Sequence, residues 1–144
     1  MSPDLPFPDR VRQFLDDLRY ATVSTIDLDG APRQAVTWYS VDGDEIVVNS
    51  ALGRRWPSNL LRDPRIAVSV IDGANGLRWV GLTGTVRAIT DRATSQADIA
   101  AMARRYQAIE PGDDAERVIR ERFERQDRVT FRFRPTGIHD HLDE

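Results

Sequence analysis

The chain has 144 residues, a formal net charge of −3 and no cysteine. This length suits one domain with one core, and the lack of cysteine excludes disulfides and thiolate chemistry. The acidic balance argues against a nucleic-acid partner, and no apolar run is long enough to span a membrane. The first residues also lack the basic and apolar regions of a signal peptide. We therefore expect a single domain over residues 1–144 that is cytoplasmic and binds neither nucleic acid nor membrane.

All 20 basic residues are arginine. Any anion-binding site in this chain must therefore be built from guanidinium groups, which bind phosphate and carboxylate in a fixed fork geometry. Chemistry that depends on a lysine Schiff base is excluded.

The N-terminal part of the chain predicts a helix followed by strands. An apolar stripe at helical spacing predicts a helix over residues 9–18 that covers the core. Segments that alternate apolar and polar side chains follow, with Asp- and Gly-rich turns between them: residues 20–26, 34–41 and 45–50. Because short turns join antiparallel neighbours, we predict that these strands form a meander.

The remaining predicted elements are strands at 66–71, 78–89 and 129–134 and helices at 91–109 and 115–126, with a loop at 111–114. In the long extended run, Gly81 and Gly84 indicate a bend or a close backbone approach rather than a nucleotide-binding loop. On the second helix, Glu116–Arg120 and Glu121–Arg125 are spaced as i,i+4 ion pairs. Closing a sheet of this size removes its edges, so we predict a mainly β fold, a six-stranded antiparallel barrel with peripheral α-helices.

Residues 49–65 hold the densest group of local signals in the chain. Pro57 suits the first turn of a helix and Asp63-Pro64 ends one, so we predict a helix over residues 55–62. Gly53 makes a tight loop before that helix.

This stretch brings a strand end and a helix start together. The strand delivers Ser50, and Arg54 and Arg55 follow where the helix begins. Free backbone N–H groups, the positive end of the helix dipole and two guanidinium groups would then converge on one point, which suits a phosphate. The alternative is a basic surface connection without a ligand.

Other polar groups give weaker signals. His139 and His141 flank Asp140 in a C-terminal tail that we expect to lack the rigidity of a metal site, so no metal site is predicted. His139 could instead lie near a cofactor. Asp27 and Asp29 lie in a turn, where aspartate bonds to the backbone, so we do not expect a catalytic carboxylate pair.

Three aromatic residues are open to two interpretations. Trp38, Tyr39 and Trp79 lie on predicted strands, where they would either pack in the core or form the aromatic wall of a ring-binding cleft.

Along residues 49–65, a strand is followed by Gly53-Arg54-Arg55, by a helix with Asn59-Leu60, and by Arg62-Asp63-Pro64-Arg65 at the start of the next strand. This order of elements resembles the pyridoxamine 5′-phosphate oxidase-like split β-barrel superfamily. Within it, residues 49–65 are most similar to the branch that uses coenzyme F420, a deazaflavin. The resemblance extends over residues 14–137, with 77–84 as weaker support. It implies a split β-barrel and an obligate homodimer with cofactor sites at the subunit interface.

The resemblance also implies cofactor-binding positions. The phosphate tail would be held by Ser50, Ala51, Arg54, Arg55, Trp56 and Asn59, with Asn49 and Pro57 beside them. The ring would lie along Gln34, Ala35, Val36 and Thr37. From the partner subunit, Trp79 and Arg128 would complete the pocket.

The implied activity is that of a coenzyme F420-dependent oxidoreductase, which transfers a hydride between the reduced cofactor and a small conjugated or heteroaromatic substrate. No catalytic residue is predicted, because such chemistry belongs largely to the cofactor. Many relatives carry a lysine where this chain has Trp56, which leaves FMN open as the cofactor. The alternatives are an FMN-dependent reductase or oxidase and a non-catalytic flavin-binding carrier.

Overall fold

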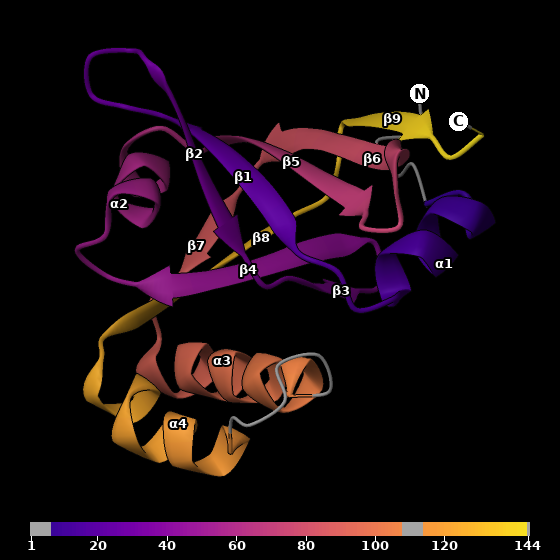
Figure 1. Cartoon of the computed structure of the whole chain (residues 1–144). Coiled ribbons are helices and arrows are strands. Elements are labelled where there is room, and N and C mark those ends of the chain that lie inside the picture. The colour runs from indigo at the N-terminus through magenta and orange to yellow at the C-terminus, as the bar shows by residue number, and fades with distance from the viewer. Residues whose placement is uncertain (1–6, 108–113, 144) are drawn as a thin grey trace.

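The computed structural model describes residues 7–107 and 114–143 (Figure 1). In chain order its elements are α1 (Asp9–Asp16), β1 (Ala21–Ile26), β2 (Pro32–Thr37), β3 (Ser40–Asp42), β4 (Glu45–Ala51), α2 (Arg55–Arg62), β5 (Arg65–Asp72), β6 (Asn75–Thr85), β7 (Arg87–Ile89), α3 (Arg92–Tyr106), α4 (Ala115–Glu121), the 3₁₀ turn η1 (Phe123–Arg125), β8 (Arg128–Phe133) and β9 (Gly137–His141). The predicted Ile109 and most of the loop at 111–114 lie outside the described residues.

The strands form two antiparallel sheets. One sheet has the order β2-β1-β5-β6-β9 and the other has the order β3-β4-β8-β7. The main core lies between them and includes Val23, Val48, Val68 and Phe131. The mainly β, antiparallel class predicted from the sequence is confirmed, but the described chain has nine strands instead of six.

The antiparallel pairings of the predicted meander are confirmed, but its middle segment at 34–41 divides between the two sheets. The break falls at Tyr39, which is fully buried. Its hydroxyl donates a hydrogen bond to the Leu15 carbonyl at 2.7 Å, and its N–H donates to the Tyr106 hydroxyl at 3.1 Å. These tertiary bonds take the backbone out of one ladder, so β2 pairs with β1 while β3 pairs with β4.

The long extended run also divides. It begins at Asn75 and breaks at Val86, whose N–H donates to the Pro64 carbonyl at 2.9 Å. Close backbone approach is confirmed at both glycines. A Cβ on Gly84 would lie 2.7 Å from the Phe133 ring, and a Cβ on Gly81 would lie 2.8 Å from the Trp79 ring.

The C-terminal segment is more ordered than its sequence predicts. Residues 137–141 form β9 on the edge of β6, and the His141 ring stacks on Trp79 with centroids 4.2 Å apart. Asp140 forms an ion pair with Arg10 at 2.7 Å. His139 is exposed opposite Gly81 and does not line the cleft described below. No group of three or more potential metal ligands occurs among the described residues.

The helices α3 and α4 lie together on one side of the sheets (Figure 1) and bury a second apolar cluster against Val47 of β4. The predicted pairs Glu116–Arg120 and Glu121–Arg125 are absent from the described part of the chain. Glu116 turns instead to Arg104 of α3, at 2.8 Å, and Arg125 lies beyond the end of α4. Among the helices of the described residues, none has the length and apolar character needed to cross a membrane.

Candidate functional site

A cleft of about 330 Å³ opens where the ends of β2, β4 and β8 meet the start of α2 and the α3–α4 pair. It brings together predicted site residues from distant parts of the chain: Val36, Thr37, Asn49, Ser50, Arg54, Trp56 and Arg128. It also includes side chains that the sequence did not assign to a site: Tyr20, Ile99, Met102, Arg122 and Phe123, besides the undecided Trp38.

Strand pairing and one tight loop position the polar end of the cleft. Ser50 and Ala51 at the end of β4 lie opposite Val129 and Arg128 at the start of β8. Gly53 then adopts a φ of 95°, a left-handed conformation that favours glycine. The chain turns there so that Arg54 becomes the N-cap of α2, which places it beside the strand ends.

Two buried polar groups in the cleft lack the partners that buried groups usually have. Ser50 is 1% exposed, and its Oγ has no hydrogen-bond partner among the described residues. Arg128 is 6% exposed and forms no ion pair within the described chain. Leaving a buried hydroxyl unpaired costs about 1–3 kcal/mol. Such groups are typical of a site completed by a ligand.

The cleft also concentrates positive charge that no carboxylate balances. Most arginines of the chain form ion pairs, as Arg33 does with Asp27 and Arg132 with Glu45. Arg54, Arg122 and Arg128 form none with the residues that the structure describes, and no carboxylate lines the described cleft. Burial, followed by the charges of Arg54 and Arg122, lowers the pKa of the Arg128 guanidinium to about 10, so it remains protonated at neutral pH. The cleft is therefore suited to an anion.

Apolar and aromatic side chains form the opposite wall of the cleft. The Trp38 ring stacks on Tyr106 with centroids 5.1 Å apart and meets Phe123 edge-on at 6.2 Å. Of the three undecided aromatics, Trp38 therefore lines the cleft, Tyr39 is buried in the core and Trp79 stacks on His141. A polar end and an aromatic wall together suit a planar ring that carries an anionic group.

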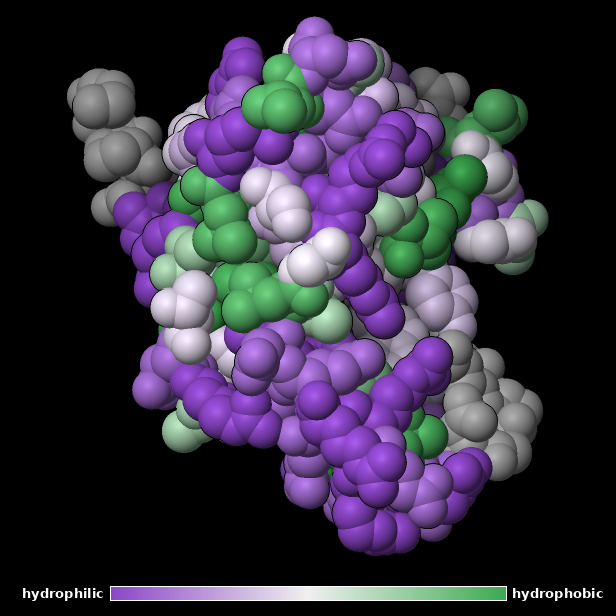
Figure 2. Space-filling model, turned by 90° about the vertical axis from the view of Figure 1, so that its left-hand side faces the viewer, coloured by the Kyte–Doolittle hydropathy of each residue, from purple (hydrophilic) through white to green (hydrophobic). Residues whose placement is uncertain are grey.

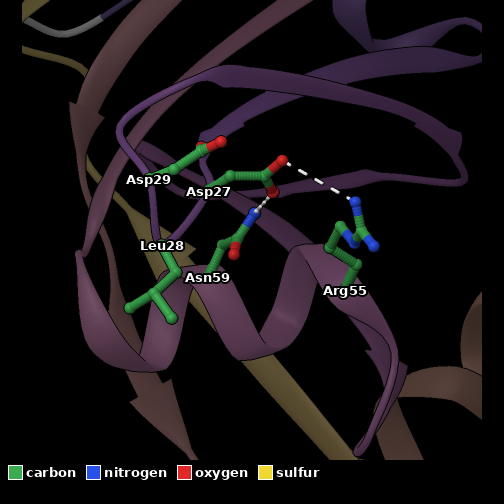
Figure 3. Close-up of a pocket in the computed structure, with 5 residues that line it drawn as sticks. All are labelled: Asp27, Leu28, Asp29, Arg55 and Asn59. Atoms are coloured by element: carbon green, nitrogen blue, oxygen red, sulfur yellow. Dashed lines mark hydrogen bonds and ion pairs between the residues drawn. The ribbon is translucent and has the colours of Figure 1, made fainter.

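Arg55 and Asn59 lie at a different hollow, of about 420 Å³, on the β1–β2 side of α2 (Figure 3). The Asn59 amide donates to Asp27 at 2.8 Å, and Arg55 lies 3.7 Å from the same carboxylate. Hydrogen bonds from Asn59 and then Arg33 hold the pKa of the Asp27 carboxyl below its usual value. Arg54 and Arg55 thus line different hollows, because Arg54 is the extended N-cap residue before α2 whereas Arg55 is the first residue of the helix.

The turn carboxylates also differ from each other. Asp29 accepts a hydrogen bond from the Ala31 N–H at 3.0 Å, as predicted for a turn. Asp27 instead binds side chains and fastens the β1–β2 hairpin to α2, so the prediction that it bonds to the backbone is wrong.

Several predicted residues lie away from the cleft of the single chain, and two others reach it in an unexpected way. Gln34 is exposed and Ala35 is half-buried on β2, while Ala51 and Pro57 are buried beside the cleft. Trp79 lies on β6 against His141. Arg128, expected from a partner subunit, reaches the cleft of its own chain. Trp56 lines the cleft and packs its ring 6.0 Å from Phe131 in the core.

The unassigned residues of the cleft come mainly from α3 and from the turn that follows α4. The apolar stripe of α3 predicted burial of Ile99 and Met102 but not which part of the sheet they would face. One available signal was Arg122: it has no acidic residue four positions before or after it, unlike Arg120 and Arg125.

Comparison with known proteins adds the following findings. The sequence profile of the pyridoxamine 5′-phosphate oxidase family matches residues 7–142. A solved F420 reductase is 25% identical, with a TM-score of 0.73 over 89% of this chain and 94% of that chain. The conserved hypothetical protein Rv2991 from Mycobacterium tuberculosis is 20% identical, with a TM-score of 0.70 over 98% of this chain and 89% of that chain.

More distant structures share the fold alone. HutZ, the heme storage protein from Vibrio cholerae, is 14% identical, with a TM-score of 0.69 over 94% of this chain and 95% of that chain. Among curated protein sequences, none matches.

Proposed function

Because the chain belongs to the pyridoxamine 5′-phosphate oxidase family, we propose that it is an oxidoreductase that binds coenzyme F420 in the cleft. It would transfer a hydride between the reduced cofactor and a small conjugated or heteroaromatic substrate. The likeness to an F420 reductase over most of both chains supports the choice of cofactor.

The observation that carries this proposal is the polar end of the cleft. A phosphate needs donors and positive charge, and the unpaired Ser50 hydroxyl, the Arg54 guanidinium and the Arg128 guanidinium meet there without a carboxylate. Each contact to a charged group contributes about 1.5–3 kcal/mol. The start of α2 adds free backbone N–H groups.

The remaining lining suits the ring of the cofactor. We propose that the ring lies along β2, against Val36 and Thr37, with Trp38 and the α3 side chains opposite. The bound deazaflavin would supply the hydride, and the protein would orient its ring and exclude water. The described cleft is lined by hydroxyl-bearing residues but by no carboxylate or histidine, so the proton that completes the reduction would come from solvent or from Tyr20, Thr37 or Ser50.

We also propose a homodimer with a cofactor site at each interface, completed by Trp79 of the partner subunit. Apolar side chains gather on the face that carries α2, above the mostly hydrophilic α3–α4 pair (Figure 2). Leu28, Val36 and Leu61 are 83%, 68% and 48% exposed. Exposed apolar groups of this kind mark interaction surfaces. Light scattering of the cofactor-bound protein should give twice 16.3 kDa; a 16.3 kDa particle would contradict the dimer.

The second candidate is an FMN-dependent reductase or oxidase. It stays open because Trp56 stands where the family resemblance implies a lysine, so the phosphate end lacks that positive charge. A flavin carrier without catalytic activity is the third.

Fluorescence titration separates these candidates. We expect coenzyme F420 to bind more tightly than FMN, and reduced F420 to lose its hydride to members of a panel of quinones, enones and tetrapyrroles. Equal or tighter binding of FMN would favour the second candidate. Binding of F420 without turnover of any panel member would favour a carrier.

A further inference from the structure

Arg128 is held in an unusual way for a buried cation. Its Nε donates to the Asn49 side-chain oxygen at 2.7 Å, its Nη1 donates to the Gln126 side-chain oxygen, and its guanidinium lies 4.8 Å from the centre of the Phe123 ring. Both hydrogen-bond acceptors are neutral amides. Buried charges are usually paired with an opposite charge.

The Asn49 amide is itself fixed in one orientation. Its nitrogen donates to the Ser95 carbonyl at 3.0 Å and to the Thr130 hydroxyl at 2.9 Å. Because a carbonyl can only accept, the amide nitrogen must face Ser95, and the amide oxygen must therefore face Arg128. Asp98 of α3 accepts the Thr130 proton at 2.8 Å, which leaves the Thr130 oxygen to accept from Asn49.

The turn that carries the second amide is anchored from the same helix. The Gln96 amide donates to the main-chain carbonyls of Phe123 and Gln126, each at 2.9 Å. These bonds hold the turn against α3. The turn carries the Phe123 ring, which lies against the guanidinium of Arg128, and Gln126, which accepts its hydrogen bond. Nη2 of Arg128 has no hydrogen-bond partner among the residues that the structure describes.

Strand β8 offers an internal contrast. Arg132, on the same strand, donates to the carboxylates of Glu45 and Asp42, so its charge is balanced within the protein. Arg128 also donates to two side chains, but these are the uncharged amides of Asn49 and Gln126. Hydrogen bonds fix the position of both guanidinium groups, but only the charge of Arg132 is neutralised.

We propose that Asn49 and Gln126 are positioning residues that hold Arg128 without neutralising it, so that its charge remains available for the phosphate of the ligand in the cleft. From α3, Ser95 and Asp98 fix the orientation of the Asn49 amide, and Gln96 fixes the backbone of the turn that carries Gln126. The inference rests on the proposed function and assigns to Asn49 and Gln126 a role that acts through Arg128.

Gln126→Glu tests this directly, because it keeps the shape and the acceptor while adding a charge beside Arg128. The ligands come in matched pairs with and without phosphate: FMN with riboflavin, and coenzyme F420 with its phosphate-free deazaflavin alcohol. We expect the affinity for each phosphate-bearing ligand to fall about ten- to a hundred-fold, the loss typical of a charge-assisted contact. The phosphate-free ligands should bind as they do to the wild type.

Stability gives a second readout, which separates a loss of phosphate affinity from a loss of fold. The melting temperature of Gln126→Glu without ligand should equal or exceed that of the wild type, because the buried cation gains a carboxylate. Gln126→Met, which removes the acceptor without adding charge, should melt earlier and lose less phosphate affinity than Gln126→Glu. Gln13→Glu on α1, which makes the same chemical change far from the cleft, should alter neither property.

Inorganic pyrophosphate separates this inference from the proposed function. If the wild type binds neither flavin nor deazaflavin but is stabilised by pyrophosphate, and Gln126→Glu is not, the inference holds and the proposed function fails. If the wild type binds the cofactors and Gln126→Glu binds them equally well, the inference is overturned and the function stands. It is also overturned if phosphate-bearing and phosphate-free ligands lose affinity equally, or if the wild type responds to no phosphate compound.

Discussion

The two hollows on either side of α2 contain similar residues but differ in their charge balance. In the first hollow, Arg33 and Arg55 form ion pairs with the Asp27 carboxylate, and the Asn59 amide donates a hydrogen bond to it. In the cleft, Arg54, Arg122 and Arg128 meet none among the described residues. The first hollow is a structural joint between a hairpin and a helix, whereas we propose that a ligand completes the second.

The difference shows that a cluster of arginines does not by itself identify an anion site. Arg54 and Arg55 are neighbours in the sequence, yet one faces each hollow. What distinguishes them is whether a carboxylate lies within reach, and this depends on the β1–β2 turn, which is distant in the sequence. The comparison can be tested by removing members of each hollow in turn.

The largest expected effect separates the two neighbouring arginines. Arg54→Ala should weaken cofactor binding about ten- to a hundred-fold, because it removes a charge-assisted contact that no other group replaces. Arg55→Ala should change affinity by less than about threefold, because an exposed ion pair contributes only about 0–1 kcal/mol. Titration of both variants with coenzyme F420 measures this. Equal losses would instead support convergence of the two arginines on one phosphate.

The next effect concerns stability rather than binding. Asn59 is 3% exposed and its amide donates to both Asp27 and Thr25. Asn59→Ala should therefore reduce the free energy of unfolding by about 1–3 kcal/mol, since it leaves buried acceptors unpaired. Cofactor affinity, measured well below the melting temperature, should stay near the wild-type value. A large loss of affinity in a protein of normal stability would assign Asn59 to the ligand.

How far the sequence predicts this molecule depends on how local the determining contacts are. The helix over residues 55–62 was predicted to the residue, because Pro57 and Asp63-Pro64 act within the segment itself. The break at Tyr39 was missed, because it depends on bonds to Leu15 and Tyr106 from other parts of the chain. β9 was missed because Ile138, His139, Asp140 and His141 show no apolar alternation; the strand is held by pairing with β6.

The candidate site follows the same rule. Ser50, Arg54 and Arg128 lie at strand ends or at the start of a helix, positions that the resemblance and the local pattern already indicated. Met102 and Phe123 reach the cleft only because α3 and α4 pack across it. A helical stripe predicts that such residues are buried but not against which neighbours.

A smaller effect should appear in the pH dependence of stability. The pKa of Asp27 is lower in the folded protein than its usual value, so the unfolded chain binds this proton more readily. The contribution of Asp27 is therefore present above the usual carboxyl pKa and is lost as the pH falls through the folded-state value. Chemical denaturation from pH 7 down to the acid limit should show Asp27→Asn less stable than the wild type near neutrality, with the gap closing in acid. A gap independent of pH would show that the hydrogen bonds, and not the charge, hold the joint.

The smallest effect is expected at Ser50, where stability and binding should move in opposite directions. Its hydroxyl is buried without a partner among the described residues, so Ser50→Ala removes an unpaired polar group and should raise the free energy of unfolding of the ligand-free protein by up to about 1 kcal/mol. The same change removes a donor from the proposed phosphate contacts, which should cost about 0.5–1.5 kcal/mol of binding, or roughly two- to tenfold in affinity. Ser58→Ala is the matched control, because the Ser58 hydroxyl is exposed and donates to the Arg54 carbonyl within α2. Denaturant melts without ligand and titrations with coenzyme F420 measure both quantities on the same preparations. If Ser50→Ala were destabilised, the hydroxyl would have a structural partner, and the strongest sign of a ligand at this end of the cleft would be removed.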